Sequence, residues 1–156
     1  MWKTILGRED HSATSSSNKS FAVEAIAGIA VTSEADDAPV ESVLYPDRET
    51  GWRAGEPGRQ IVRVTFGRPT NIRHIQLTFR ESQLTRTQEF TLSCTVPGGE
   101  RREVIRQQWT FSPQGSTEEV EDYRVTLDDV VVLELAINPE ISNRGVHASL
   151  FRLRIG

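Results

Sequence analysis

Two alternating apolar runs separated by a short polar segment constrain this chain more than any other feature. The apolar positions are Val62, Val64 and Phe66 in the first run and Ile75, Leu77 and Phe79 in the second. A period of two places such side chains on one face of a strand. The connecting residues Gly67–Asn71 read GRPTN, which contains turn-forming residues and nothing apolar to bury. The sequence therefore predicts two antiparallel strands joined by a tight turn, with one face buried.

Similar alternation recurs along the rest of the chain. Further strands are predicted at residues 28–33, 89–96, 103–111, 123–127, 131–137 and 151–155. Only residues 40–44 suggest a short helical turn, and no long amphipathic helix is predicted. About eight strands without a long helix are typical of an all-β fold, an antiparallel two-sheet β-sandwich or jelly roll.

Length and composition bound the domain organisation and the class of protein. The chain has 156 residues, enough for one domain with a substantial core. The segment 7–20 is polar and rich in serine, so we expect a flexible lead-in over residues 1–20 and a single β-sandwich binding domain over residues 21–156.

The charge and the segments that the sequence lacks exclude several function classes. The net charge of −4 provides no global field for nucleic acid. One cysteine, Cys94, cannot form an intramolecular disulfide, and no clustered Cys/His pattern predicts a metal site. No apolar stretch has the length of a signal peptide core or a membrane span. We therefore expect a soluble, cytoplasmic protein with no cofactor, no nucleic-acid partner and no membrane partner.

The direction of the predicted strands places the long loops together. Consecutive antiparallel strands send alternate loops to opposite ends of a sandwich, and the longer loops all fall at one end. These loops are residues 53–58, 80–88, 112–119 and 139–148. Long loops at one end of a rigid sandwich are where such folds usually carry recognition.

Several segments, in order, resemble a known family. They are APVESVL at residues 38–44, Asp47, TGWRA at 50–54, QIVRVTF at 60–66, LELAINP at 133–139 and ASLFRLRI at 148–155. Together they are similar to the galactose-binding-like domains, also known as discoidin or coagulation factor 5/8 type C domains. The segment around Trp52 is also similar to the amino-terminal domain of the DNA single-strand-break repair scaffold. The resemblance implies a jelly roll that binds either carbohydrate or protein.

The resemblance also implies structural roles for three residues. Trp52 is expected in the core. Calcium-binding relatives use an acidic residue early in the loop before the tryptophan and a glutamate in the last strand, positions that are Tyr45 and Arg152 here. Because a guanidinium cannot ligate a cation, we expect no metal. We hypothesise that Arg152 takes the ion's place and pairs with Asp47 or Glu49, the alternative being a solvated outward arginine.

The predicted ligand site lies in the long loops. Its residues are Arg53, Arg80, Arg86, Asn143, Arg144 and His147. Sugar-binding relatives usually add an exposed aromatic side chain, and these loops offer none that is free, because Trp109 is expected to face inward. Four converging arginines would favour an anionic partner, such as an acidic sugar, a phosphate or a carboxylate-rich protein surface. The alternative is a solvated arginine rim.

No constellation of residues predicts catalysis. Cys94 shares a face with apolar neighbours, and a lone loop histidine, His147, has no predicted nucleophile beside it. The leading interpretation is a non-catalytic carbohydrate-binding module, with an anionic sugar as one candidate ligand. The alternative is an intracellular protein-interaction scaffold domain, and an enzyme is a remote third.

Overall fold

The computed structural model describes residues 1–6, 8–13, 23–142 and 144–156, and of residues 8–13 only the backbone. These residues form ten strands and two short 3-10 helices. The strands are β1 Trp2–Ile5, β2 Arg8–Ala13, β3 Ile26–Val31, β4 Trp52–Pro57, β5 Gln60–Arg80, β6 Arg86–Thr95, β7 Arg101–Phe111, β8 Glu118–Asn138, β9 His147–Leu150 and β10 Arg152–Ile155. The 3-10 helices are η1 Val23–Ala25 and η2 Val40–Leu44, the second of which the sequence predicted. No helix within the described part of the chain is long and apolar enough to cross a membrane.

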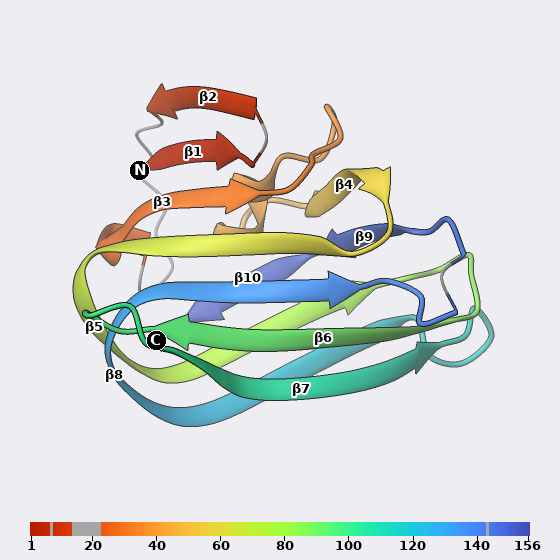
Figure 1. Cartoon of the computed structure of the whole chain (residues 1–156). Coiled ribbons are helices and arrows are strands. Elements are labelled where there is room, and N and C mark those ends of the chain that lie inside the picture. Colours follow the sequence, from red (N-terminus) through yellow and green to blue (C-terminus); the bar gives the residue numbers. More distant parts are fainter. Residues whose placement is uncertain (7, 14–22, 143) are drawn as a thin grey trace.

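Two long strands, β5 and β8, build both layers of the sandwich. Each has 21 residues, and they pair antiparallel from Gln60 opposite Ile137 to Arg80 opposite Glu118. In the first layer, the half of β5 near Val62 pairs with β3, and the facing half of β8 pairs with β6, which in turn pairs with β7. In the second layer, the half of β5 near Leu77 lies between β8 and β10 (Figure 1). The predicted all-β sandwich is confirmed.

The predicted hairpin between residues 62–66 and 75–79 is wrong. Both runs belong to the continuous strand β5, and both pair with β8 instead of with each other. The segment Gly67–Asn71 bends β5 from one layer into the other, and the β5–β8 register shifts between Thr65 and His74. Because β5 pairs with β8 on both sides of the bend, the turn-forming residues of this segment let β5 pass from one layer of the sandwich to the other.

Strand β8 bends at the same end of the molecule. The predicted strands at 123–127 and 131–137 are one strand, and the residues between them include Asp129, whose φ of 57° lies in the left-handed region. Asp tolerates that conformation better than most residues. Because β5 and β8 cross between layers together, the loops over residues 81–85, 112–117, 139–142 and 144–146 lie at one end of the sandwich, as predicted (Figure 1). Residues 53–58 were also predicted as a loop, but Trp52–Pro57 form strand β4.

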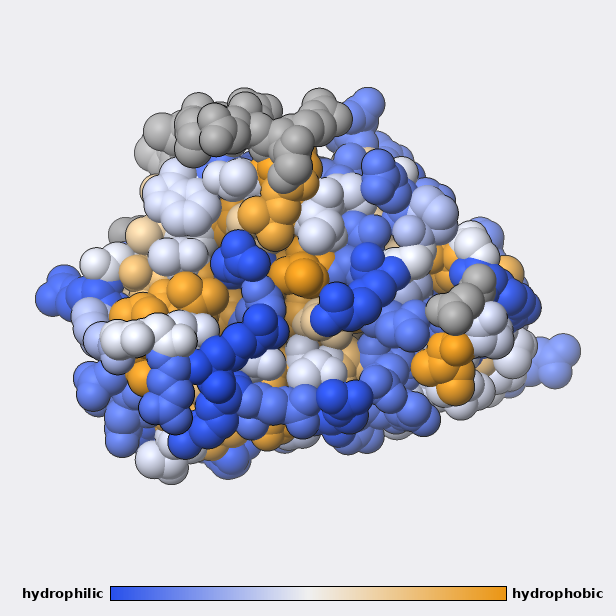
Figure 2. Space-filling model, in the orientation of Figure 1, coloured by the Kyte–Doolittle hydropathy of each residue, from blue (hydrophilic) through white to orange (hydrophobic). Residues whose placement is uncertain are grey.

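The predicted alternation does define the core. Val62, Val64, Ile75, Leu77 and Phe79 are all at most 1% exposed. The two layers meet where the rings of Phe79 and Phe90 stack with centroids 5.3 Å apart. The outer face of the first layer is mainly hydrophilic (Figure 2), and ion pairs such as Arg63 Nη2 to Glu134 Oε1, 2.9 Å, cross it.

Two strands lie within the segment 1–20 that was predicted as a flexible lead-in. Strand β1 pairs in parallel with β3, and β2 pairs with β1 at the sheet edge. Lys3 fastens β1, because its Nζ lies 2.8 Å from Glu34 Oε2 and 2.7 Å from Glu41 Oε2. Part of the predicted lead-in therefore extends the sheet. Residues 14–22 lie outside the described residues, so the boundary at residue 20 remains a prediction.

Candidate functional site

The long loops and the adjoining ends of β4, β5, β8 and β9 line an open cavity of about 1010 Å³ at one end of the sandwich. Five segments line it: residues 34–36, 53–55, 80–84, 117–118, and 145–149 without the buried Ala148. Three of the predicted site residues, Arg53, Arg80 and His147, are among its lining residues. A concave site of this size, close to the upper end for small-ligand pockets, can enclose a ligand of one or a few rings.

Arg80 is held in place at the cavity wall by two contacts. Its Nε donates to Glu118 Oε2 at 2.9 Å, and its guanidinium carbon lies 3.6 Å from the centre of the Phe151 ring. The neighbouring Arg53 donates from Nη2 to Asp37 Oδ1 at 3.0 Å. Both arginines are about half exposed. Each therefore keeps donors for a ligand while its charge is already balanced by a carboxylate.

His147 has a defined tautomer when its ring is neutral. The Nδ1 atom lies 3.0 Å from the carbonyl oxygen of Ala54. Because a carbonyl oxygen only accepts, Nδ1 carries the proton, which leaves Nε2 as an acceptor. His147 is exposed and lines the cavity. The arrangement offers an acceptor from His147 beside the donors of Arg80 and Arg53.

The cavity lining contains an exposed aliphatic residue where an aromatic platform was sought. Leu84 is 43% exposed, and none of the described lining residues is aromatic. Trp52 is 1% exposed, as expected for the core, and its Nε1 donates to the Ser33 carbonyl at 3.0 Å. Trp109 is half-buried and donates to Ser116 Oγ at 3.1 Å. The described cavity lining therefore offers no Phe, Tyr or Trp ring on which a sugar could stack.

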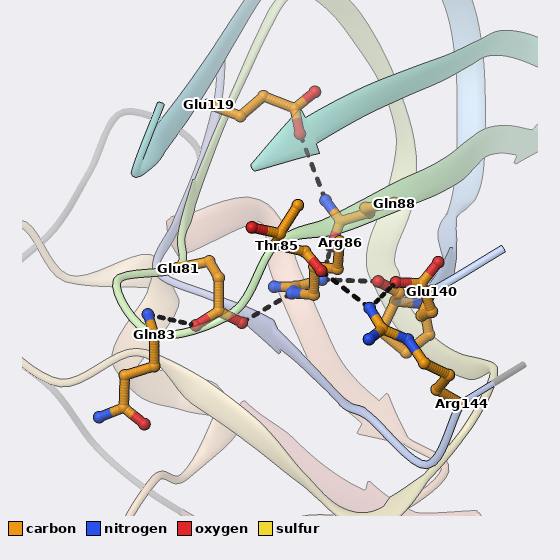
Figure 3. A network of polar contacts seen from close by, with 9 residues as sticks. Glu81, Gln83, Thr85, Arg86, Gln88, Glu119, Glu140 and Arg144 are labelled. Atoms are coloured by element: carbon orange, nitrogen blue, oxygen red, sulfur yellow. Dashed lines mark hydrogen bonds and ion pairs between the residues drawn. The ribbon is translucent and has the colours of Figure 1, made fainter. Parts of the chain in front are cut away.

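Arg86 does not reach the cavity, although it was predicted to contact ligand. Its side chain is 1% exposed, and Nε donates to Glu81 Oε1 at 2.7 Å (Figure 3). Its Nη1 donates to the Pro139 carbonyl at 2.8 Å and to Gln88 Oε1 at 3.2 Å. Arg86 lies on the inward face of β6, so it braces the cavity loops from beneath.

Arg144 also braces loops instead of lining the cavity. Its Nη2 donates to the Thr85 carbonyl at 2.8 Å and to Glu140 Oε2 at 2.6 Å (Figure 3). The hydrogen bond from Arg144 lowers the pKa of Glu140, against the effect of burial. The neighbouring Asn143, another predicted ligand residue, lies outside the described residues.

Comparison of the chain with known proteins finds relatives by structure alone. No family model matches the sequence, and no curated protein matches it. Among solved structures, the family 32 carbohydrate-binding module from C. perfringens NanJ, in complex with galactose, is 17% identical with a TM-score of 0.60 and covers 88% of this chain and 97% of its own. The family 32 module of AlyQ, in complex with 4,5-unsaturated mannuronic acid, is 16% identical with a TM-score of 0.58 and covers 84% and 95%.

A similar structure also comes from a protein complex. Reduced XRCC1 bound to the DNA polymerase β catalytic domain is 13% identical with a TM-score of 0.58 and covers 84% of this chain and 93% of its own. The chain has the galactose-binding-like fold. At these identities the likeness shows the fold alone, so the ligand must be argued from the residues of this chain.

The galactose-binding-like fold brings Arg152 to the loop before Trp52, as the resemblance implied. The Arg152 guanidinium donates to the carbonyl of Ser42 at 2.9 Å and to the carbonyls of Tyr45 and Arg48. Burial lowers the pKa of Arg152, and the charge of Arg80 adds to this effect, whereas Asp47 opposes it. The cation at these carbonyls is thus a side chain of the chain itself, and the residues do not fit a calcium ion.

The hypothesis about Arg152 is refined by this geometry. The Arg152 guanidinium donates to backbone carbonyls, whereas the hypothesis named the carboxylates of Asp47 or Glu49 as its partners. Asp47 contributes through its charge. Arg152 therefore does not behave as a solvated outward residue, because its donors connect β10 to η2 and the following loop.

Other cavity residues were not predicted from the sequence. They are Glu34, Asp36, Ser82, Leu84, Thr117, Glu118 and Ser149. Glu34 lies in the segment after β3, and this segment was not among the loops predicted at the recognition end. No local pattern marks this segment, because it is held at the cavity end by a hydrogen bond from Trp52 Nε1 to the Ser33 carbonyl, 19 positions away in the sequence.

Proposed function

We propose that this chain is a non-catalytic binding module whose loop-end cavity binds a carbohydrate. The observation that carries the proposal is the combination of Arg53, Arg80 and His147 around one cavity, with Leu84 exposed beside them. Sugar hydroxyls act as donors and acceptors at once, and this lining supplies both functions. The solved carbohydrate-binding modules with the same fold support the proposal by analogy.

The balance of charge in the cavity supports a neutral sugar over an acidic one. The lining includes four carboxylates, Glu34, Asp36, Glu81 and Glu118, against two arginines. Arg86 and Arg144, which would have made the site cationic, are committed to internal partners. We therefore favour a neutral sugar. The sequence prediction of an anionic ligand assumed that four loop arginines face the ligand.

Non-catalytic binding is supported by what surrounds the potential reactive groups. Cys94 is 2% exposed within the core, so it lacks the access that a nucleophile needs. In the described part of the chain, no group of three or more His, Cys, Asp or Glu side chains could hold a metal ion. His147 is oriented by its hydrogen bond with the Ala54 carbonyl, a backbone group that cannot act as a nucleophile.

A protein partner is the second candidate. Two large apolar side chains, Leu84 at 43% and Ile141 at 45%, are exposed in the loops at the cavity end. Arginine is enriched in protein interfaces, and the core of an interface is more apolar than the rest of the surface. The similar structure of XRCC1 was solved with a protein partner, which supports this candidate by analogy only.

A thermal-shift screen of the full chain against neutral and acidic sugars tests the proposal. Ligand that binds only the native state stabilises it by RT ln(1 + [L]/Kd), about 2.7 kcal/mol at 100 times Kd. We expect neutral sugars to raise Tm equally in the wild type and in His74→Gln, whereas a tenfold weaker affinity in His147→Gln would leave about half of the stabilisation, about 1.4 kcal/mol, at the same sugar concentration. His74 is a matched control because it lies away from the cavity lining, paired with Asp122. The absence of a shift with any sugar would favour the protein partner.

A further inference from the structure

Beneath the cavity wall, β8 buries a carboxyl group, Glu119, that the proposed function does not use. Glu119 is 0% exposed, whereas its neighbours Thr117 and Glu118 line the cavity. Its Oε1 accepts from Gln88 Nε2 at 3.3 Å (Figure 3). Its Oε2 has no hydrogen-bond partner and no exposure to solvent. A buried carboxylate oxygen without a donor is costly, so the site favours a form that carries a proton.

The groups that face Glu119 come from two strands. On β8 itself, Glu121 contacts Glu119, and the Tyr123 hydroxyl donates to Glu121 Oε2 at 2.9 Å. On β6, Gln88 contacts Glu119 directly and Arg86 acts on it by charge. Two carboxyl groups in contact need a proton between them, because neither carboxylate can donate a hydrogen bond to the other when both are ionised. Burial first, then Glu121, raises the pKa of Glu119 to about 8, and Gln88 and Arg86 oppose the shift.

A chain of hydrogen bonds connects this carboxyl to the cavity wall. Gln88 donates to Glu119 and accepts from Arg86 Nη1 at 3.2 Å. Arg86 Nε in turn donates to Glu81 Oε1 at 2.7 Å, and Glu81 Oε2 accepts from the backbone amide of Gln83 at 3.1 Å. Residues 81–84 are the part of the loop that lines the cavity. Arg86 thus lies between two acids, one inside and one at the wall.

We propose that the chain Glu119–Gln88–Arg86–Glu81 is a proton-sensitive latch on the cavity wall. With Glu119 neutral, its proton satisfies the contact with Glu121, and Arg86 is committed to Glu81. When Glu119 releases its proton to solvent, the new carboxylate repels Glu121 and attracts Arg86. The ion pair between Arg86 and Glu81 then weakens, and residues 81–84 become more mobile. The claim that the latch regulates ligand binding rests on the proposed function. The claim that it changes the mobility of residues 81–84 does not.

The loop effect is measured without any ligand. NMR of the full chain follows the Glu119 side-chain carboxyl carbon, the Arg86 Nε–H group and the Gln83 amide as pH rises from 6 to 9.5. We expect all three to move with one midpoint in the wild type. In Glu119→Gln, which keeps the shape and a neutral side chain, the Arg86 and Gln83 signals stay at their low-pH positions. Glu100→Gln, at the opposite end of the sandwich, serves as the control and should titrate like the wild type.

Two results would overturn the latch. One is a Gln83 signal that moves equally in Glu119→Gln and in the wild type. The other is a Glu119 titration during which Arg86 stays unchanged. If Glu119→Gln does not fold, Glu121→Gln replaces it: removing the neighbouring charge should lower the midpoint of all three signals, and an unchanged midpoint would contradict the proposal.

The link to ligand binding is tested separately with the sugar that gives the largest thermal shift. For one linked proton with a pKa near 8, affinity falls at most about tenfold between pH 7 and pH 9. We expect such a fall in the wild type and in Glu100→Gln but not in Glu119→Gln. If the protein binds sugar with the same pH dependence in the wild type and in Glu119→Gln, and the Arg86 Nε–H signal does not shift with pH, the latch is rejected and the proposed function stands. If the Arg86 signal shifts with pH but the protein binds no sugar, the latch stands and the proposed function is rejected.

Discussion

The Arg152 guanidinium donates to the Ser42 carbonyl at 2.9 Å, joining residues 110 positions apart in the chain. The same side chain also bonds the carbonyls of Tyr45 and Arg48. One fixed charge therefore connects the last strand to the loop that precedes Trp52. Because Ser42 and Tyr45 are buried, their carbonyls lose a charged donor in a poorly hydrated site if Arg152 is removed.

We predict that Arg152→Ala lowers the free energy of unfolding by about 3 kcal/mol, because buried carbonyls lose their donor. Chemical denaturation measures this difference. Arg154→Ala, two positions along the same strand and exposed, should change it by less than about 0.5 kcal/mol. Added calcium should leave Tm of the wild type unchanged. A strong rise in Tm with calcium would show that a calcium ion, instead of Arg152, binds these carbonyls.

Removing Arg86 should be more damaging than removing either cavity arginine. Arg86→Met leaves the largely buried Glu81 carboxylate and the Pro139 carbonyl without their donor. Losing one partner of a buried ion pair costs roughly 3–5 kcal/mol. Denaturation of Arg86→Met and Arg80→Met should show a much larger loss for the first. Equal losses would contradict the buried role of Arg86.

The raised pKa of Glu119 gives stability a pH dependence of known sign. Because the folded-state pKa of about 8 lies above the ordinary value of 4.5, Glu119 contributes stability that is fully present below pH 4.5. That contribution is lost as pH rises toward 8, at no more than about 1.4 kcal/mol per pH unit.

The matched variant isolates this contribution from that of other groups. Unfolding free energies of the wild type and Glu119→Gln should be similar near pH 4.5 and diverge up to pH 8, with the variant the more stable. A constant difference across this range would show that Glu119 titrates normally.

A glycine marks the close approach of β4 to the end of β9. A Cβ at Gly51 would lie 2.3 Å from the Leu150 carbonyl oxygen and 2.6 Å from the Phe151 Cα, both backbone atoms that cannot move aside locally. Gly51→Ala should destabilise the fold by roughly 1–3 kcal/mol. Gly115→Ala is the control, because a Cβ there would meet nothing within 4 Å. Thermal unfolding of the two variants decides whether this contact is required.

The core could be predicted from the sequence, but the strand connectivity could not. The alternation of Val62 through Phe79 found the buried face, because burial acts on each residue locally. The GRPTN segment signals a change of direction, and the same residues suit a hairpin or a crossing between layers. What decides between them is the long-range pairing of β5 with β8, from Gln60 to Arg80, which no local pattern contains.

For the site, the sequence predicted the end of the sandwich at which the cavity lies but not the position of every side chain. Arg53, Arg80 and His147 line the cavity. Arg86 was misplaced because it was assigned to a loop, whereas β6 begins at that residue. The alternation of Phe90 and Leu92, carried back by two and four residues, puts Gln88 and Arg86 on the inward face. That signal was present in the sequence.

The most direct test of the central claim, that the loop-end cavity binds a carbohydrate, is an NMR titration of the wild type with a neutral sugar. It should follow the arginine Nε–H signals. We expect the signals of Arg53 and Arg80 to shift with one common Kd, while that of Arg106, similarly exposed but on β7, stays fixed. His147→Gln should weaken the affinity by about tenfold or more, the loss expected for one hydrogen bond of about 1.5 kcal/mol. Shifts at Arg106 alone, or none at saturating sugar, would contradict carbohydrate binding at this cavity.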